Sequence, residues 1–549
     1  MTRRLAFIIA AVFLCSAAAE GAFASQSGVV VVTSTSTGTS RHSPNTGHLL
    51  IARSISSRAD PRVLRCGGFD DTALIRRADA RRQPVIIRHG VTCASESQTI
   101  STLLIVEPGG LLKPLTGHTI TIKSFDNEGL WQKFTNALPG QGRVVFANQW
   151  SPIPNWWIPN AVQGTTDMTK AIQAAVDSLP RGGVVRLQPE TYLTGQITIK
   201  SHGTTLEGQG AHTAPRGLKP TTLLFQGLPN GQSGIVDSGF LGLTVRNVYL
   251  ELPSGTGGAA IKVMNASQVL IENVGFTISR GGGSVGIQFS DRGVTGDNAV
   301  TASTIRHCTG GGPAETTFLI GSGSTSIHLD NVYALGASKA GIEFHHATYS
   351  QVTASAVDSG LGTAYGYLVD ASTGITITSS GAESNGKGYC RITGGSTGVT
   401  VIGGRGVGNN TSADRTIGSF VQIDAGGNYG ITIIGGTDTS PNAATTRSIH
   451  AETGTLWTNL IGYNSASFPK GYDGDSTWKA NFLSVIAGGE LIVGSVATRS
   501  AQWLTGPKPS CSEITRGTVW YVAGAVGAKD TFEVCAKDAQ NVFGWRVLY

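Results

Sequence analysis

The sequence predicts an all-β protein, a right-handed parallel β-helix solenoid with an N-terminal capping helix and small β modules at both ends. Its composition is rich in Gly, with 75 of 549 residues, and poor in charge, with 14%, as expected of a chain with many tight turns. Short apolar segments of period two recur along residues 184–465. One amphipathic helical segment stands directly before them, and we expect it to cover the end of the stack.

The helical segment begins near Asp167, whose carboxylate can accept hydrogen bonds from the free backbone N–H groups of a first turn. Its apolar face consists of residues at helical spacing: Ala171, Ile172, Ala175 and Val176. A proline and a pair of glycines follow and predict its end. Residues from Asp70 onward echo the same pattern, which predicts a second helix followed by β segments.

The β segments recur at a period of roughly 24 to 34 residues, which is the signature of a solenoid. Three of them place an asparagine in register at a turn: Asn247, Asn273 and Asn331. Stacked amides at such a turn can bond each other and cap buried backbone, which is a structural role. A β-propeller, with a longer and more regular repeat, is the alternative architecture.

The stretch 164–210 resembles the entry module of the pectate-lyase superfamily, in its rhamnogalacturonase/epimerase-like group. There, a helix with Asp-Asp-Thr precedes a Val-Val-x-Leu-Pro-x-Gly-x-Tyr strand. Here Thr166-Asp167-Met168-Thr169 and Pro189-Glu190-Thr191 stand at the matching places, and Pro154-Asn155-Trp156-Trp157 resembles the family's Pro-Glu-Trp-Trp. The resemblance implies a right-handed parallel β-helix. None of these residues is catalytic in that family, and the motif sets of polygalacturonase-like hydrolases, alginate epimerases and pectate lyases are not found.

The chain divides into five segments. The first has Arg3 and Arg4, an apolar core and small residues at its end, which is typical of a secretory signal peptide; a lone membrane anchor is the alternative. We therefore expect a secreted, periplasmic or cell-surface protein. The segments are 1–25 signal peptide, 26–60 Ser/Thr-rich linker, 61–160 small β module, 161–484 parallel β-helix and 485–549 small β module.

Six cysteines remain after the signal segment, in an oxidising compartment. Two pairs lie within the end modules, and we expect them to form local disulfides: Cys66 with Cys93, and Cys511 with Cys535. Cys308 and Cys390 lie about three coils apart, roughly 14 Å at the spacing of β-strands, which is beyond the reach of a disulfide. We expect both as separate buried thiols.

The second strand of each coil predicts a ladder of polar side chains along one outward face. Its members are Lys262, Gln288, Glu343, His345, Asp370, Arg391, Gln422, Asp424, His450 and Glu452. An extended face of this kind can offer one subsite after another to an extended polysaccharide. A solvent-facing strand is also polar simply because it is wet, so the ladder alone does not settle a role.

Two reactions suit this ladder. Glu343 and Asp370, one coil apart, can form the carboxylate pair of a glycosidase. Alternatively, a base removes the proton next to a uronate carboxylate, with His345, Arg391 or Lys262 as that base. We expect Glu343, His345, Asp370 and Arg391 as catalytic residues. The expected substrate-binding residues are Lys262, Gln288, Gln422, Asp424 and His450.

A β-elimination also needs a cation that neutralises the uronate carboxylate. Ca²⁺ prefers hard oxygen ligands, and Asp330, Glu343 and Asp370 are the candidates. No third ligand beside His345 and His346 appears at a spacing that would predict zinc. No cofactor is otherwise indicated.

The sequence therefore predicts a secreted enzyme that degrades an extended, uronate-containing polysaccharide by β-elimination. A glycoside hydrolase and a non-enzymatic, tailspike-like carbohydrate-binding protein are the alternatives. The formal net charge of +6 is mild for 549 residues, and no basic run with interleaved aromatics indicates nucleic acid. We expect no membrane partner after signal cleavage, and a homotrimer remains open.

Overall fold

The structure is a computed structural model of the chain. It describes residues 66–547 except 127, 149, 212–219, 294–297, 415, 440–446, 453–457, 462–469, 475–479, 487–489, 494–509, 513–515, 517, 518, 523–528 and 530. All described residues belong to one compact unit, Ala59–Tyr549. The expected signal peptide and linker lie outside the described residues. No helix among the described residues is long and apolar enough to cross a membrane.

The expected N-terminal β module is itself built of parallel coils. It starts with helix α1 (Thr72–Ala80), which confirms the second helix. Strands β1 (Val85–Ile87), β3 (Gln98–Val106), β5 (Thr119–Phe125) and β6 (Arg143–Phe146) form a parallel sheet, and β2 (Thr92–Ser95) pairs in parallel with β4 (Leu111–Pro114). The expected disulfide Cys66–Cys93 is present and ties the start of the module to β2.

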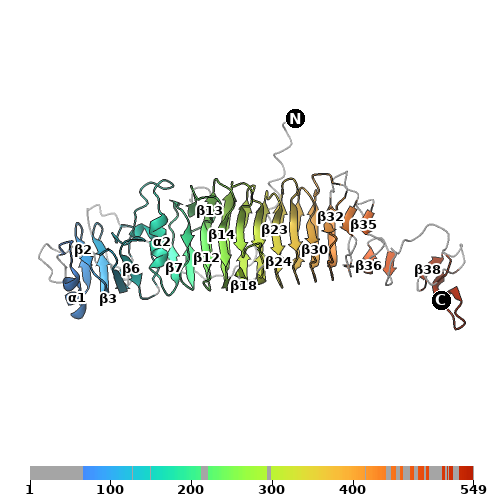
Figure 1. Ribbon diagram of the computed structural model, residues 1–549, viewed down its shortest axis with the longest axis horizontal. Helices are drawn as coiled ribbons and strands as arrows, with labels where there is room; N and C mark the ends of the chain where they lie inside the picture. Colours follow the sequence, from blue (N-terminus) through green and yellow to red (C-terminus); the bar gives the residue numbers. More distant parts are fainter. Residues whose placement is uncertain are drawn as a thin grey trace, which may run out of the picture. The chain divides into compact units, whose positions relative to one another are not determined.

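Helix α2 (Thr169–Asp177) stands between this module and the long stack of coils (Figure 1). It begins at Thr169, and the Asp167 carboxylate accepts the backbone N–H of Thr169 at 2.9 Å. All four residues of the predicted apolar face are buried. The 3-10 helix η1 (Pro154–Trp156) packs against α2, and both Trp156 and Trp157 are buried. The capping helix is therefore confirmed.

The coils of the long stack contribute strands to three faces, here called A, B and C. Face A contains β7 (Gly183–Arg186), β10 (Thr204–Glu207), the first parts of β13 (Thr244–Leu252) and β16 (Leu270–Ile278), β15 (Ala266–Ser267), β18 (Val300–Arg306), β21 (Thr325–Asp330), β24 (Gln351–Thr353), β27 (Thr376–Thr378), the first parts of β30 (Thr400–Val407) and β32 (Thr432–Thr439), β34 (Thr458–Ile461) and β36 (Ala480–Ile486).

Face B contains β8 (Thr191–Leu193), β11 (Thr222–Leu224), β19 (Thr309–Gly311), β22 (Tyr333–Leu335), β25 (Ala356–Asp358), β28 (Gly381–Glu383) and the second parts of β13, β16, β30 and β32. Face C is a separate 11-stranded sheet: β9 (Ile197–Thr198), β12 (Ile235–Ser238), β14 (Ala259–Met264), β17 (Val285–Phe289), β20 (Thr316–Ile320), β23 (Ala340–His345), β26 (Tyr365–Asp370), β29 (Cys390–Thr393), β31 (Val421–Ile423), β33 (Arg447–Ala451) and β35 (Lys470–Gly474).

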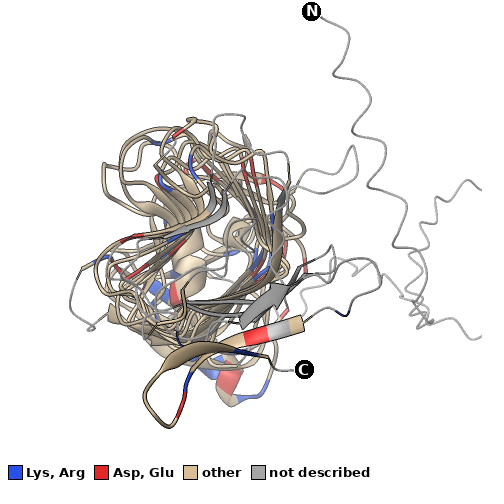
Figure 2. Ribbon diagram, turned by 90° about the vertical axis from the view of Figure 1, so that its right-hand side faces the viewer, with Lys and Arg blue, Asp and Glu red and all other residues tan. Residues whose placement is uncertain are grey.

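Every coil-to-coil pairing along these faces is parallel up to β36, which is the arrangement of a parallel β-helix. Viewed along the stack, the coils superpose around a common interior (Figure 2). The predicted right-handed parallel β-helix is confirmed, and the alternative of a propeller is wrong because successive coils pair edge to edge in long sheets.

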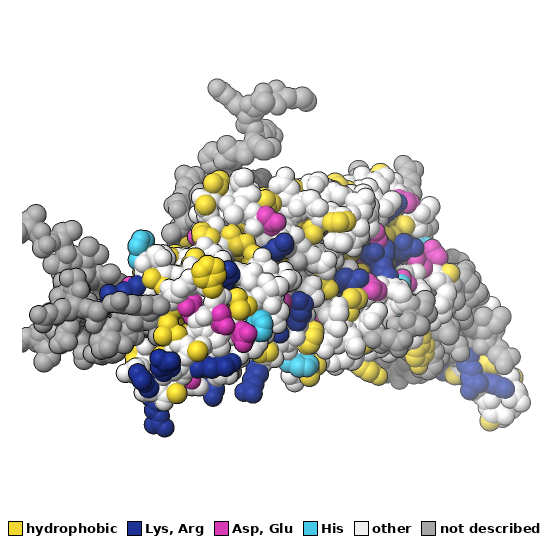
Figure 3. Space-filling model, turned by 60° about the vertical axis from the view of Figure 1, so that its left-hand side comes forward, with side chains coloured by type: hydrophobic (Ala, Val, Ile, Leu, Met, Phe, Trp, Pro, Cys, Tyr) yellow, Lys and Arg dark blue, Asp and Glu magenta, His cyan; other side chains and the backbone are white. Residues whose placement is uncertain are grey.

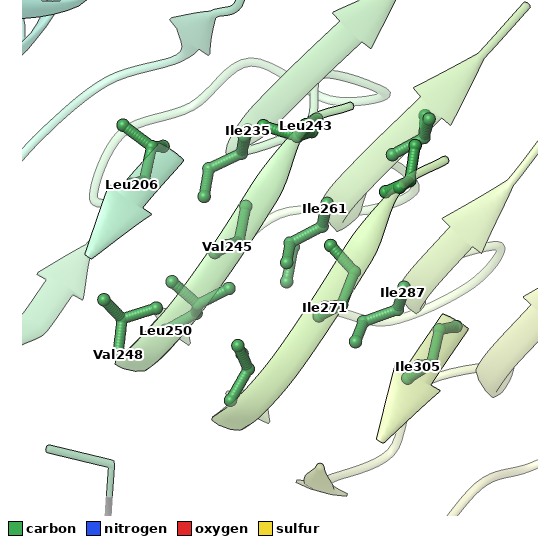
Figure 4. Packing of buried hydrophobic residues seen from close by; sticks show 14 of the residues in the cluster. Leu206, Ile235, Leu243, Val245, Val248, Leu250, Ile261, Ile271, Ile287 and Ile305 are labelled. Atoms are coloured by element: carbon green, nitrogen blue, oxygen red, sulfur yellow. The ribbon is translucent and has the colours of Figure 1, made fainter. Parts of the chain in front are cut away.

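The core lies between the faces and is made of stacked aliphatic files. Figure 4 shows two of them, Leu206, Val245, Ile271 and Ile305 from face A, and Ile235, Ile261 and Ile287 from face C. All seven are fully buried. Each such side chain contributes about 1.5–3 kcal/mol when it leaves water, so the repetition of these files holds the coils together.

The corner between faces A and B is a file of residues with left-handed backbone. Their φ angles lie between 48° and 62°. In coil order they are Asn247, Asn273, His307, Asn331, Ala354, Ser379, Gly403 and Gly435. The Asn273 amide donates to Asn247 Oδ1 at 2.8 Å. The expected asparagine stack is thus formed by this pair, while His307 stands between Asn273 and Asn331.

At the C-terminal end, β37 (Glu490–Val493) pairs antiparallel with β36. Strands β38 (Val519–Val522), β39 (Thr531–Lys537) and β40 (Phe543–Val547) form a three-stranded antiparallel sheet, joined to Cys511 by the expected disulfide with Cys535. Cys308 and Cys390 are separate buried thiols, as expected.

Candidate functional site on face C

The predicted polar ladder lies on the outward side of face C. The strand register places Lys262, Gln288, Leu319, Glu343, Leu368, Arg391, Gln422 and His450 in one file. A second file contains His345 and Asp370, which are direct register partners. Two leucines therefore interrupt the expected ladder. Glu343 faces Leu368 rather than Asp370, because the two acids are offset by two positions along their strands.

A hollow of about 250 Å³ opens over the first coils of this face. Its lining residues are Gly231, Gly258, Lys262, Gly283, Val285, Gln288, Asp291, Arg292 and Leu319. Val285 and Leu319 belong, with Ala259, to a small buried apolar cluster that is separate from the main core. The hollow thus has polar walls above an almost buried apolar cluster.

Two successive inward positions on β17 explain how Val285 comes to lie on the outside. A Cβ at Gly286 would lie 2.2 Å from the Thr317 carbonyl oxygen and 2.3 Å from the Phe276 ring, so this position points into the packed interior. The next residue, Ile287, is also in the main core. With two successive inward positions, both Val285 and Gln288 project outward and line the hollow.

The polar wall contains an ion pair. Lys262 Nζ lies 2.8 Å from Asp291 Oδ1. The Gln288 amide donates to the same Asp291 oxygen at 2.8 Å and to the Ser290 carbonyl at 3.0 Å. These bonds hold the expected substrate-binding residues Lys262 and Gln288 together with Asp291, which sequence reasoning did not single out.

Arg280 holds together the two turns that carry Gly231 and Gly258, two glycines that line the hollow. Its side chain is fully buried. It donates to the carbonyls of Leu228 at 2.8 Å, Gln232 at 3.0 Å and Gly257 at 3.1 Å. Because buried backbone oxygens need partners, one guanidinium fixes two neighbouring turns.

The next cluster is centred on Glu343, whose side chain is fully buried. Arg292 binds it with two bonds, Nε to Oε1 at 3.1 Å and Nη2 to Oε2 at 2.8 Å. Lys339 Nζ donates to Oε1 at 2.7 Å, and the Thr316 hydroxyl donates to Oε2 at 2.7 Å. Both carboxylate oxygens are therefore fully engaged.

These contacts fix the charge of Glu343. Burial alone would raise the pKa of its carboxyl group, but the hydrogen bonds and charges of Arg292 and Lys339 lower the pKa below its usual value. Glu315 adds a further contact, with Oε1 at 2.9 Å from Arg292 Nη1. The result is two partly exposed cations held over one buried anion.

His345 lies beside this cluster and is held at both ring nitrogens. Nδ1 is 2.9 Å from Asp370 Oδ2, and Nε2 is 3.0 Å from the Arg292 carbonyl oxygen. The Asp370 carboxylate is an acceptor, so Nδ1 donates to it. The hydrogen bond from His345 lowers the pKa of Asp370.

A third cluster stands further along the stack. Arg391 Nη2 lies 2.6 Å from Asp424 Oδ2, and its guanidinium lies 5.5 Å from the centre of the Tyr365 ring. The Gln422 amide lies 3.3 Å from Asp424 Oδ1 and 3.4 Å from Glu452 Oε1. Four expected residues, Arg391, Gln422, Asp424 and Glu452, are thus brought together. His450 is the register partner of Gln422.

The three carboxylates proposed as Ca²⁺ ligands do not fit that role. Asp330 ends β21 on face A, on another sheet from Glu343 and Asp370. Glu343 is engaged by Arg292 and Lys339, and Asp370 by His345. Among the described residues, no three His, Cys, Asp or Glu side chains gather so that they could hold a metal ion.

Sequence reasoning missed four charged residues of the site: Asp291, Arg292, Glu315 and Lys339. Asp291 and Arg292 follow β17, and Glu315 and Lys339 directly precede β20 and β23. They lie in turns, outside the period-two pattern that identified the ladder. The one available signal is the spacing of Lys339 and Glu343, which belong to the same coil.

Comparisons with known proteins bear on the fold. No family model and no curated protein matches the sequence. Similar solved structures include the A-module of mannuronan C-5 epimerase AlgE6 from Azotobacter vinelandii, with 16% identity over 60% of this chain and 97% of that chain at a TM-score of 0.40. DFA-IIIase from Arthrobacter chlorophenolicus A6 is 15% identical over 58% of this chain and 95% of that chain, with a TM-score of 0.39.

The gp42 tailspike of Acinetobacter phage vb_AbaP_AS12 is 13% identical over 77% of this chain and 85% of that chain, with a TM-score of 0.45. The fold expected from the resemblance to the pectate-lyase superfamily is thus confirmed by the chain's own sheets. At such identities and TM-scores, none of these likenesses bears on what this chain does.

Proposed function

We propose that this protein acts on an extended glycan that lies along face C. The observation that carries the proposal is the hollow, whose walls hold the Lys262–Asp291 ion pair and the Gln288 amide above the almost buried side chains of Val285 and Leu319. Sugar rings present a rim of hydroxyls, and a site that recognises them holds donors and acceptors in fixed positions, as the bonds among Lys262, Gln288 and Asp291 do here.

The row of clusters supports an extended ligand rather than a single sugar. The hollow, the Arg292–Glu343 cluster and the Arg391–Asp424 cluster follow one another along the strand register of face C. Successive coils lie about 4.8 Å apart, so polar groups recur along the stack axis as they do along a polysaccharide. In the view of Figure 3 most of the protein surface is uncharged, and the charged side chains form small patches.

Cleavage by β-elimination is the finer proposal. In it, Arg292 and Lys339 bind a uronate carboxylate and stabilise the negative charge that develops beside it. His345 acts in its neutral form, with its proton on Nδ1 donated to Asp370, and takes the proton from the adjacent carbon on Nε2 once this nitrogen has turned away from the Arg292 carbonyl. The electron pair forms the new double bond as the glycosidic C–O bond breaks, and the leaving oxygen takes a proton from water.

A hydrolase that uses Glu343 and Asp370 is less well supported. A general acid needs a carboxyl group with a raised pKa, whereas the pKa values of both groups are lowered by their partners. Both carboxylates are already bonded to Arg292, Lys339 or His345. This favours a second candidate, a protein that binds a glycan without cleaving it. In that case the ion pairs serve as rigid donors and acceptors for hydroxyl groups.

Export is part of the proposal. Disulfides persist in oxidising compartments, and the two disulfides Cys66–Cys93 and Cys511–Cys535 support such a location. The homotrimer stays a prediction, which light scattering of the purified protein would test.

A panel of glycans tests the function. The full chain is incubated with pectin, alginate, glucuronan, neutral glucans and fructans, and ultraviolet absorbance of unsaturated products, reducing ends and binding are measured. Unsaturated products from a uronate glycan support elimination, reducing ends alone support hydrolysis, and binding without products supports the second candidate. No binding and no products with any glycan would contradict the whole proposal.

A further inference from the structure

The net positive charge of this chain comes mostly from one short stretch of the sequence. Residues 53–88 contain nine Arg, no Lys, four Asp and no Glu, whereas the whole chain has 41 Lys and Arg against 35 Asp and Glu. Almost all of the formal net charge of +6 therefore belongs to this stretch. Its described part, residues 66–88, comprises α1 and the strand that follows and contains five of these Arg and three of the Asp.

The arginines of α1 and of the turn after it are exposed to solvent. Arg76, Arg77, Arg81 and Arg82 are all exposed. Within the described residues, no carboxylate forms an ion pair with any of them; Arg76 donates to the Ser97 carbonyl at 3.3 Å. Figure 3 shows Lys and Arg side chains crowded at the lower left, at the end of the protein that carries α1.

The nearby acids do not neutralise this surface by direct contact, because their carboxylates are bonded to backbone N–H groups. Asp70 accepts from Thr72, and Asp79 accepts from Ser101 and Thr102. Asp71 accepts from Gly67, Gly68 and Ala94. The disulfide Cys66–Cys93 fixes the same segment, so the arginines sit on a rigid base.

An exposed aromatic side chain lies in the turn just before α1. Phe69 is 87% exposed, more than any other large apolar side chain of the described residues. Guanidinium groups bind phosphates in a planar, two-bond geometry. Exposed aromatics beside cations are typical of surfaces that lie at the boundary between lipid headgroups and acyl chains.

We propose that the α1 end of this protein, with Arg76, Arg77, Arg81, Arg82 and Phe69, binds the surface of a bilayer that contains anionic phospholipids. The partner is identified by charge complementarity together with the exposed aromatic ring. This interaction goes against the sequence-based expectation that the exported protein has no membrane partner. It is independent of the glycan site on face C.

Vesicle sedimentation tests the proposal. The full chain is mixed with vesicles of phosphatidylglycerol and phosphatidylcholine, or of phosphatidylcholine alone, at low and high salt. We expect sedimentation with the anionic vesicles, weakened by salt, and none with the neutral ones. Replacing Arg77, Arg81 and Arg82 with Gln should weaken binding about a hundredfold.

The matched control replaces Lys123, Lys170 and Arg181 with Gln. These cations are also exposed, and the change in net charge is the same, so binding should stay within about twofold. Equal sedimentation with neutral vesicles, equal loss in the control, or binding to heparin or DNA but not to anionic vesicles would each overturn the proposal. Circular dichroism of both variants verifies that the fold is retained.

Discussion

Arg292 and Glu343 lie 51 positions apart and form a two-bond ion pair across two coils of face C, with Nε–Oε1 at 3.1 Å and Nη2–Oε2 at 2.8 Å. The carboxylate is fully buried while the guanidinium is partly exposed. A buried anion thus holds a surface cation in one orientation. This pair fixes the turn after β17 against β23.

Replacing Glu343 with Gln should therefore destabilise the fold as well as weaken glycan binding. The amide keeps the shape but leaves Arg292 and Lys339 without their buried counter-charge, which costs about 3 kcal/mol. Urea unfolding followed by fluorescence measures the loss. The matched control is Glu315→Gln, because Glu315 also pairs with Arg292 but is 28% exposed; it should cost under about 1 kcal/mol. Equal effects of the two variants would contradict a buttressing role for Glu343.

Gly286 offers a test of how the hollow is built. A Cβ there would collide with the Thr317 carbonyl and the Phe276 ring, so Gly286→Ala should cost about 1–3 kcal/mol by overpacking and displace Val285. At Gly282, nothing lies within 4 Å of the added Cβ, and Gly282→Ala should leave the stability almost unchanged. Thermal unfolding of the two variants compares them directly. A harmless Gly286→Ala would mean that this position does not point into the core.

Asp237 predicts an unusual dependence of stability on pH. Its carboxyl group is fully buried, with Oδ2 unpartnered, and burial raises its pKa to about 6. The raised pKa means that this group's contribution to stability is complete below about pH 4 and is lost as the pH rises through about 6.

Replacing Asp237 with Asn should remove this dependence and stabilise the protein at pH 8 by up to about 3 kcal/mol. Denaturant titrations at pH 5 and pH 8 would measure it. The Phe240 N–H that binds Oδ1 at 3.0 Å keeps an acceptor in the amide. If Asn gave no greater benefit at pH 8 than at pH 5, Asp237 would be ionised in the folded protein at no cost.

The cysteines predict a labelling pattern. Burial raises the pKa of the Cys308 thiol to about 12 and also raises that of Cys390. Neither should react with iodoacetamide in the native protein, because only an accessible thiolate is nucleophilic. Both should react after unfolding without reductant, while Cys66, Cys93, Cys511 and Cys535 should need reduction first. Peptide mass mapping reads out each site, and labelling of native Cys390 would contradict the packing of β29.

The sequence was enough for the architecture because the inward residues repeat. The capping helix at Asp167, the outward file from Lys262 to His450 and both disulfides could be predicted from period and local spacing. The charged partners could not, because Arg292 lies in a turn and reaches Glu343 only through the stacking of coils of unequal length. For the same reason the offset of Glu343 and Asp370 was not predictable: it depends on strand register.

The central claim, that a glycan lies along face C, is tested most directly by a pair of lysine variants. Lys262 pairs with Asp291 in the hollow at 2.8 Å, and Lys200 pairs with Asp177 at 3.1 Å elsewhere. With an oligosaccharide selected from the panel, calorimetric titration should show binding reduced at least about tenfold by Lys262→Gln, as loss of a charged hydrogen bond implies, and unchanged by Lys200→Gln. Unaltered affinity of Lys262→Gln, or equal loss in both variants, would contradict the assignment of face C.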